Sequence, residues 1–346
     1  MAKSKKSDNP EDFMKVLYIG GTGVISSGCI GPAVRKGIDL FLFNRGSSTP
    51  GYEGAQLSEV TVVKGDIADR DSLRKLVDSE RFDVVVDWIA FTVEDVERDI
   101  ELFSGKVGQY IFISSASAYQ KPPRSLPVTE STPLHNPFWQ YSRDKIACEE
   151  RLMRAYREGG FPVTIVRPSH TYGKKMIPSI FDKGPIILDR IRRGKELVVP
   201  GDGTNRWVVT HNSDFAKAFV GLLGAPQAIG EAYTITSGEA LTWDQIHTIV
   251  AGKLGLEARI VHIPADFITS LYPEFTGPLH GDKIHSVDFD NTKVRSLVPD
   301  FICSTPFHLG VEGSLRHFEA HPDEFAADEE LNAKMDDIVA RYRRLG

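Results

Sequence analysis

Residues 16–28 read VLYIGGTGVISSG, and the rest of the chain is organised around them. A run of apolar and β-branched residues stops at Gly20 and Gly21, and a helix-like segment follows at once. A strand, a glycine turn and a helix in this order point backbone N–H groups and the helix dipole at an anion. Glycine suits the turn because a side chain would keep a diphosphate away from the backbone. Taken alone, the spacing Gly20-x-x-Gly23-x-x-Ser26 also fits an ordinary strand-to-helix turn.

The composition predicts an ordinary soluble globular protein. Of the 346 residues, 25% are charged and 41% are hydrophobic, and this length suggests about two domains. The net charge of −6 comes with no basic stripe, so we expect neither nucleic acid nor an anionic membrane as the main partner. No apolar run approaches the roughly 18 residues that a membrane helix needs.

The cysteines and the N-terminal residues indicate whether the protein binds a metal and in which cellular compartment it lies. Cys29, Cys148 and Cys303 are too widely spaced for a Cys-x-x-Cys or zinc pattern, and the histidines show no metal-ligand spacing. We therefore expect no metal site. The polar, Lys-rich start lacks the apolar core of a secretory signal, so we interpret residues 1–14 as a disordered extension and expect a cytoplasmic protein.

Strand and helix patterns alternate along the first half of the chain. The strands are apolar on both faces, which is typical of a parallel sheet covered by helices on each side. Right-handed crossovers then give a doubly wound α/β fold, whose ligands bind beyond the carboxyl ends of the strands. The predicted strands are 16–19, 39–43, 60–63, 83–89, 110–113 and 163–166, and the predicted helices are 24–36, 71–76, 94–103 and 140–157.

After residue 173 the predicted elements become shorter and more mixed. This change in pattern indicates a second, smaller unit rather than a continuation of the parallel sheet. Residues 328–344 are predicted to form a charged helix on the surface. The other predicted elements are strands 197–199, 207–210 and 233–236 and helices 186–193, 214–223 and 243–254.

Tyr141 and Lys145 lie four residues apart on the predicted helix 140–157, so their side chains face the same way. A phenol has a reference pKa near 10, and a neighbouring ammonium lowers it. The pair therefore indicates proton transfer to or from an alcohol, with Tyr141 as the acid/base. On its own, a Tyr-x-x-x-Lys pair is also a common surface feature.

The order of motifs along the chain carries a family resemblance. The glycine turn is followed by Asp66-Ile67, by SSASAY at 114–119, by YSRDK at 141–145 and by RPSHTYG at 167–173. Over about residues 15–310 this order resembles the extended short-chain dehydrogenase/reductases of the NAD-dependent epimerase/dehydratase type. Each piece is weak alone, but their joint occurrence in order is specific. The resemblance implies a Rossmann-like doubly wound sheet with a smaller, mixed C-terminal substrate domain.

The resemblance also implies roles for single residues. Ser115 matches the serine that hydrogen-bonds the reacting oxygen, Tyr141 the catalytic acid/base, and Lys145 the lysine that holds the nicotinamide ribose. Residues 15–173 then form the NAD(P)-binding domain, and residues 174–346 a substrate-binding region interleaved with it. The implied cofactor-binding positions are Gly20, Thr22, Gly23, Val24, Ile25, Asn44, Arg45, Asp66, Ile67, Ala90, Tyr141, Lys145 and Pro168. The implied substrate positions are Ser117, His170 and Arg206.

Two departures from the family pattern concern the cofactor. Ser26 stands where a third glycine serves helix–strand packing, and a serine is tolerated if the helix lies slightly farther out. Asn44 stands where NAD-specific relatives carry an acidic residue for the adenosine ribose, and Arg45 follows it, with Ser47 and Ser48. A missing carboxylate and an added guanidinium suit a 2′-phosphate, so we favour NADP over NAD. The alternative is that Arg45 stacks on adenine or points to solvent.

Other features concern the substrate. Arg206 matches an arginine that contacts substrate phosphate in nucleotide-sugar enzymes. His170, however, stands where those enzymes carry an asparagine near the diphosphate, which weakens the expectation of such a substrate; a structural role for this histidine is an equal alternative. Ala116 and Ser117 replace an Asp-Glu pair of 4,6-dehydratases, so dehydration ranks lower. Four aromatic residues could line a pocket, although core packing is the expected role of each. They are Trp88, Phe91, Trp139 and Trp207.

We therefore expect an NAD(P)-dependent oxidoreductase or epimerase for a secondary alcohol of a sugar or nucleotide-sugar-like substrate. Tyr141 exchanges a proton with the hydroxyl, Ser115 holds the same oxygen, and the nicotinamide exchanges a hydride with the carbon. The alternative from another class is a non-catalytic NAD(P)-binding or RNA-binding member, since some chloroplast relatives resemble RNA-binding proteins. A sugar dehydratase ranks below both. The resemblance also implies a homodimer through helices 94–103 and 140–157.

Overall fold

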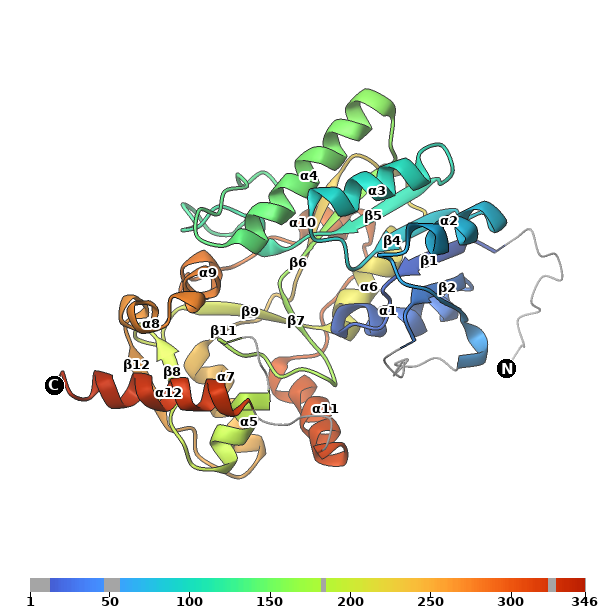
Figure 1. Cartoon of the computed structure of the whole chain (residues 1–346). Helices are drawn as coiled ribbons and strands as arrows, with labels where there is room; N and C mark the ends of the chain where they lie inside the picture. Colours follow the sequence, from blue (N-terminus) through green and yellow to red (C-terminus); the bar gives the residue numbers. More distant parts are fainter. Residues whose placement is uncertain (1–12, 47–56, 182–184, 323–327, 346) are drawn as a thin grey trace.

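The computed structural model describes residues 13–46, 57–181, 185–322 and 328–345 (Figure 1). Residues 1–12, which make up most of the expected N-terminal extension, lie outside these ranges. Within them, no helix is both long and apolar enough to cross a membrane. In the same ranges, no three His, Cys, Asp or Glu side chains are grouped in a way that could hold a metal ion.

A seven-stranded parallel sheet forms the larger part of the fold. Its strands lie in the order β10-β6-β5-β4-β1-β2-β3, so the order reverses between β1 and β4. This confirms the predicted doubly wound α/β sheet, which opens its crevice at such a reversal. The strands are β1 (Lys15–Ile19), β2 (Asp39–Asn44), β3 (Thr61–Lys64), β4 (Val84–Asp87), β5 (Gln109–Ile113), β6 (Val163–Pro168) and β10 (Ala232–Ile235).

Helices cover both faces of this sheet because alternate residues of a strand point to opposite sides. Leu17 and Tyr18, adjacent on β1, accordingly belong to two different hydrophobic cores. The core around Tyr18 includes α1 and α6, and the core around Leu17 includes α2, α3 and α4, of which α3 and α4 run side by side (Figure 1). The helices are α1 (Val24–Arg35), α2 (Arg70–Ser79), α3 (Val93–Phe103), α4 (Gln140–Gly159) and α6 (Asn212–Leu222).

The rest of the chain builds two small sheets around a further core. Strands β11, β9 and β7 form a mixed three-stranded sheet, and β8 pairs with β12 in parallel. The bounds are β7 (His170–Tyr172), β8 (Leu197–Pro200), β9 (Arg206–His211), β11 (Ala240–Thr242), β12 (Ile260–Ile263), α5 (Pro185–Arg192), α7 (Trp243–Lys253), α8 (Ala265–Leu271), α9 (Thr276–Pro278), α10 (Thr292–Leu297), α11 (Phe307–Ala320) and α12 (Glu329–Tyr342). Short 3₁₀ turns lie at Leu57–Glu59, Ala116–Ala118, Pro226–Ala228 and Pro273–Phe275, and a π-helical turn at Leu279–Lys283.

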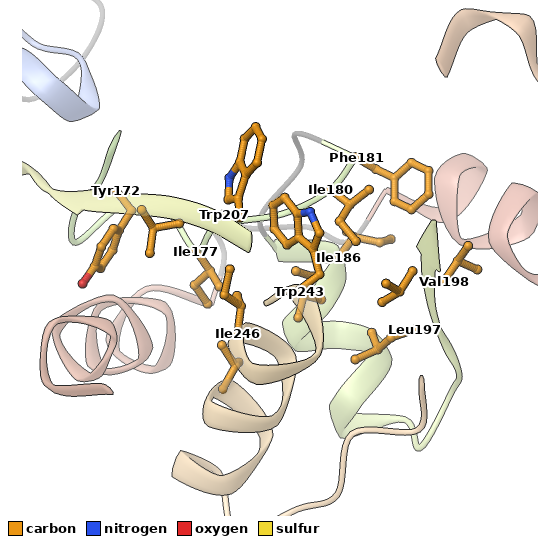
Figure 2. Close-up of a cluster of buried hydrophobic side chains, with 14 of the residues drawn as sticks. Tyr172, Ile177, Ile180, Phe181, Ile186, Leu197, Val198, Trp207, Trp243 and Ile246 are labelled. Atoms are coloured by element: carbon orange, nitrogen blue, oxygen red, sulfur yellow. The ribbon is translucent and has the colours of Figure 1, made fainter. Parts of the chain in front are cut away.

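Figure 2 shows the apolar cluster of this second part. Trp207 of β9 and Trp243 at the start of α7 stack with their ring centroids 5.4 Å apart, and both are almost fully buried. Aliphatic side chains from α5, β8 and the segment before α5 complete the cluster. Among them are Ile177, Ile180, Ile186, Leu197 and Val198.

The terminal helix α12 is not the surface helix that its charge suggests. Leu331, Met335, Ile338 and Val339 are all nearly inaccessible to solvent and belong to the same core as Trp243. Their spacing places them on one face of the helix, while the charged residues occupy the other face. The expectation of a surface helix is therefore wrong for this apolar face.

We expect Ile338→Ala to lower the free energy of unfolding by about 2–5 kcal/mol, because it leaves a cavity under α12. The control is Glu330→Ala on the exposed face of the same helix, which should change stability by less than about 0.5 kcal/mol. Urea denaturation followed by circular dichroism measures both values. Equal, small effects from the two substitutions would show that α12 is not docked.

Candidate active site

The glycine turn after β1 brings two segments of backbone into close contact. Gly20 has a φ of +86°, a left-handed conformation that favours glycine, and its N–H donates to the carbonyl of Phe43 at 2.9 Å. A Cβ at Gly20 would lie only 2.5 Å from Cγ2 of Ile89. Gly23 is the N-cap of α1, so the turn ends at a helix N-terminus, where backbone N–H groups favour an anion.

Ser26 is accommodated by hydrogen bonds rather than by open space. It is 2% exposed, and its Oγ accepts from the N–H of Gly23 at 2.9 Å and donates to the Gly23 carbonyl at 3.3 Å. The hydroxyl thereby caps the first turn of α1 from inside. It also occupies one backbone donor of the turn that a glycine at position 26 would leave open to a ligand.

The carboxyl end of β2 presents donors instead of a carboxylate. Asn44 accepts the N–H of Gly46 through Oδ1 at 2.8 Å, while its Nδ2 is buried with no hydrogen-bond partner among the described residues. Lys64 of β3 pairs in register with Asn44, and its side chain passes beside Gly46. Arg45 is exposed at the same edge. Sequence reasoning missed Lys64, because only the β2–β3 register brings it here.

The remaining residues of this region lie at neighbouring strand ends. Asp66 is exposed and accepts the N–H of Ala68 at 3.0 Å, and Ile67 packs on the core beneath the sheet. Ser47 and Ser48, which the sequence also placed beside the cofactor ribose, lie outside the described residues.

Lys145 is buried inside the fold. It is 2% exposed, and its Nζ donates to the carbonyls of Ala90 at 2.7 Å and Ile113 at 2.8 Å. These carbonyls follow β4 and end β5, so the ammonium joins α4 to two neighbouring strand ends. The Nζ also lies 4.5 Å from the ring centroid of Phe91 and 5.9 Å from that of Tyr141. Burial lowers the pKa of Lys145 to about 8.

Asp87 fixes the loop that carries the Ala90 carbonyl. Its Oδ1 accepts the N–H groups of Ile89 at 2.6 Å and Ala90 at 2.7 Å, and its Oδ2 lies 3.3 Å from Arg98. Burial, and then the neighbouring Asp99, hold the pKa of Asp87 well above its usual range. The sequence showed Asp87 only as a polar interruption of a strand, so its support of Lys145 could not be predicted.

A cavity of about 240 Å³ lies where the carboxyl ends of β5 and β6 meet β9. Among the predicted residues, Ser115, Ser117, Tyr141, Pro168 and His170 line it. Trp139, directly before α4, and Trp207 of β9 also line it. The structure adds Asp282 and Lys283 of the π-helical turn, which the sequence analysis had not assigned to a pocket.

Hydrogen bonds hold the serines of this cavity in place. The hydroxyls of Ser115 and Ser117 lie 2.9 Å apart, and that of Ser142 donates to Ser117 at 2.8 Å. Buried Asn136 donates from Nδ2 to the carbonyls of Ser117 at 2.8 Å and Gly281 at 2.7 Å. The amide therefore ties the π-helical turn to the loop after β5.

Arg206 does not reach the cavity. Its side chain is half exposed, and Nη2 lies 3.0 Å from the Asp288 carboxylate. The next residue on β9, Trp207, lines the cavity instead. The expected contact of Arg206 with a substrate phosphate is not formed in this arrangement. Trp139 and Trp207, for which core packing was the expected role and pocket lining the alternative, both line the cavity.

Comparisons with known proteins show the family of this chain. A family model described as "NAD dependent epimerase/dehydratase family" matches residues 16–236. The chain is 28% identical over 260 residues to 2′-dehydrokanamycin reductase of Streptomyces kanamyceticus, covering 74% of this chain and 71% of that protein. It is 30% identical over 268 residues to chloroplast stem-loop binding protein of 41 kDa b of Arabidopsis thaliana, covering 73% and 67%.

A solved structure shows the same fold at low identity. UDP-glucuronic acid 4-epimerase from Bacillus cereus, in complex with UDP-glucuronic acid and NAD, superposes with a TM-score of 0.71. The match covers 89% of this chain and 99% of that one at 19% sequence identity. At this identity the likeness shows the fold alone.

We expect the Lys145 ammonium to lose its proton near pH 8, whereas an exposed lysine titrates near 10.4. Below pH 8 the side chain is a cation beside Tyr141, and above it the charge is lost. NMR titration of labelled lysine side chains measures the midpoint, with the resonance assigned through Lys145→Arg. A midpoint near 10.4 would contradict the burial of this ammonium.

Proposed function

The chain belongs to the NAD-dependent epimerase/dehydratase family, and from that premise we propose that it is an NAD(P)-dependent oxidoreductase or epimerase acting on a secondary alcohol of a carbohydrate. The observation that carries the proposal is the convergence of Ser115 and Tyr141 on one cavity. The Lys145 ammonium is buried, 5.9 Å from the centroid of the Tyr141 ring.

The residues fit a dinucleotide at the sheet edge. The turn after β1 requires glycine at position 20, because φ is left-handed there and a Cβ would clash with Ile89. The N-terminus of α1 follows directly. Gly20, Ala90, Ser115 and Pro168 follow or end the adjacent strands β1, β4, β5 and β6. When bound there, the nicotinamide supplies or takes the hydride.

Side chains of this protein exchange the proton of the substrate hydroxyl and bind its oxygen. In oxidation the alcohol loses its O–H proton to Tyr141 and its C–H hydrogen as hydride, which leaves a ketone; reduction is the reverse. Ser115 donates a hydrogen bond to the same oxygen, and Ser117 with Ser142 fixes the position of its hydroxyl. The nearby Lys145 cation favours the phenolate form of Tyr141. Release after one transfer gives a reductase or dehydrogenase, and return of the hydrogen to the other face gives an epimerase.

We propose NADP as the cofactor. Asn44 has a buried amide donor without a partner among the described residues, and Arg45 and Lys64 add two cations at the same strand edge. Donors and cations suit a 2′-phosphate, whereas an acidic side chain would suit the ribose hydroxyls of NAD.

The rival function is RNA binding, which the name of the Arabidopsis relative favours. Ser115 and Tyr141 line one cavity, the Lys145 ammonium lies 5.9 Å from the Tyr141 ring centroid, and the net charge is −6. These features support catalysis instead. Dehydration stays below both, because Ala116 and Ser117 offer no carboxylate at the positions that dehydratases use for elimination.

Tyr141→Phe should lower kcat for hydride transfer by about 10²–10⁴-fold, because the reacting oxygen loses its proton partner. Nicotinamide absorbance measures the rate, and cofactor fluorescence measures binding, which should stay unchanged. Tyr156→Phe, which removes a hydroxyl from the same helix outside the cavity, is the control. Near wild-type turnover in Tyr141→Phe would rule out the proposed acid/base.

Arg45→Gln and Lys64→Gln should each weaken NADPH binding by about tenfold or more, through loss of a charged contact to the 2′-phosphate. Binding of NADH should stay the same. Isothermal titration calorimetry measures both, with Arg35→Gln at the C-terminal end of α1 as the control. If NADH binds more tightly than NADPH to the wild-type protein, the NADP proposal is wrong.

A further inference from the structure

The side chains of β9 that line the cavity indicate which class of ligand it can bind. On β9 the cavity is lined by Trp207 and Val208, whereas Arg206 at the start of the strand is not among its lining residues. The guanidinium of Arg206 is outside, paired with Asp288, and its backbone N–H donates to Ser286 at 3.0 Å. The cavity therefore meets an indole ring at this strand and not a cation.

Neighbouring rings fix the orientation of the Trp207 indole. Its ring stacks on Trp243 at an interplanar angle of 26°, and Trp243 in turn donates from Nε1 to the carbonyl of Lys283 at 3.0 Å. His170 stands edge-on to both rings, at 6.4 and 6.5 Å between centroids. An aromatic ring that is held in one orientation by a second ring is suited to stack against the apolar C–H face of a sugar.

The indole of Trp207 also carries a donor that needs an acceptor. Trp207 is 3% exposed, and its Nε1 has no hydrogen-bond partner among the described residues. A buried N–H without an acceptor costs free energy, so such groups are usually satisfied by protein, water or ligand. A hydroxyl or ring oxygen of a carbohydrate in the cavity supplies that acceptor.

Both positively and negatively charged side chains lie at the cavity. Asp282 and Lys283 are consecutive on the π-helical turn, and the Asp282 carboxylate lies 3.0 Å from the buried ammonium of Lys121. The ammonium of Lys283 lies 5.7 Å from the ring centroid of Trp139. Sugar hydroxyls can bond to a carboxylate, an ammonium or the hydroxyls of Ser115 and Ser117.

The size of the cavity also favours a small carbohydrate as its ligand. Its volume of about 240 Å³ lies below the roughly 300–1,000 Å³ typical of sites for drug-sized ligands. That space suits a single sugar ring.

Given the carbohydrate chemistry proposed above, on which this step rests, we infer that the substrate is a glycoside or free sugar without a nucleoside diphosphate. Its reacting ring lies against Trp207, with the Nε1–H donating to one of its oxygens. Lys283 and Asp282 bond to its hydroxyl groups. Substrate recognition then comes from stacking and hydroxyl contacts, and not from a phosphate clamp.

The test measures binding to the protein saturated with its preferred nicotinamide cofactor. The probes are UDP, UDP-glucose and dTDP-glucose on one side, and a panel of methyl hexosides, disaccharides and amino sugars on the other. We expect at least one glycoside to bind, and the three nucleotides to bind at least tenfold more weakly than it. Tighter binding of a nucleotide, or no binding by any glycoside of the panel, would overturn the inference.

Two variants localise the binding. Trp207→Phe keeps the plate but removes the N–H, and should raise the Kd of the glycoside about threefold to tenfold, as loss of one hydrogen bond does. Trp88→Phe is the matched control, because Trp88 also has a buried, unpartnered Nε1 but packs against Tyr18 and Phe219 in another core. Equal glycoside affinity in the wild-type protein and both variants would contradict the role of Trp207.

The same measurements separate this inference from the proposed function. A glycoside that binds through Trp207 but exchanges no hydride would refute the catalytic proposal and leave the ligand class intact. Hydride transfer that depends on Tyr141 but takes place only on a UDP-sugar or dTDP-sugar would do the reverse.

Discussion

The buried ammonium of Lys145 is the interaction on which the arrangement of the site depends. It joins α4 to the strand ends of β4 and β5 through the carbonyls of Ala90 and Ile113. An ammonium at this depth costs free energy unless its donors are satisfied, so both carbonyls must stay in place. The Ala90 loop is held by Asp87, which itself contacts Arg98. Tyr141, one helical turn before Lys145, is thereby set against the cavity.

The core around Trp243 fixes the wall of the cavity that lies opposite the strand ends of the large sheet. The stacked pair of Trp207 and Trp243 fixes one wall of the cavity, and the Trp243 N–H fixes the backbone of Lys283. Asn136 ties the same π-helical turn to the loop that carries Ser117. The serines and the π-helical turn that line the cavity are thus connected by buried hydrogen bonds, so their relative positions are set by the folded chain.

Two residues adapt the general fold to this particular chain. Ser26 uses its hydroxyl to satisfy a donor within the glycine turn, and Asn44 offers an amide where an acidic residue would accept ribose hydroxyls. Each substitution changes the hydrogen-bonding character of the cofactor edge without disturbing the sheet beneath it. The fold tolerates both because Ser26 lies in the first turn of α1 and Asn44 at the end of β2, outside the interior of the sheet.

Local pattern in the sequence was sufficient for the sheet, the glycine turn and the shared face of Tyr141 and Lys145. Apolar strands, turn residues and helical spacing act over a few residues, so they can be read from the chain directly. The tertiary structure alone decided that Trp207 rather than Arg206 faces the cavity, that Lys64 stands beside Asn44, and that Asp282 and Lys283 join the site. It also decided that one face of α12 is buried. These outcomes depend on the register and packing of segments far apart in sequence, and a one-residue change in register would reverse which side chain faces inward.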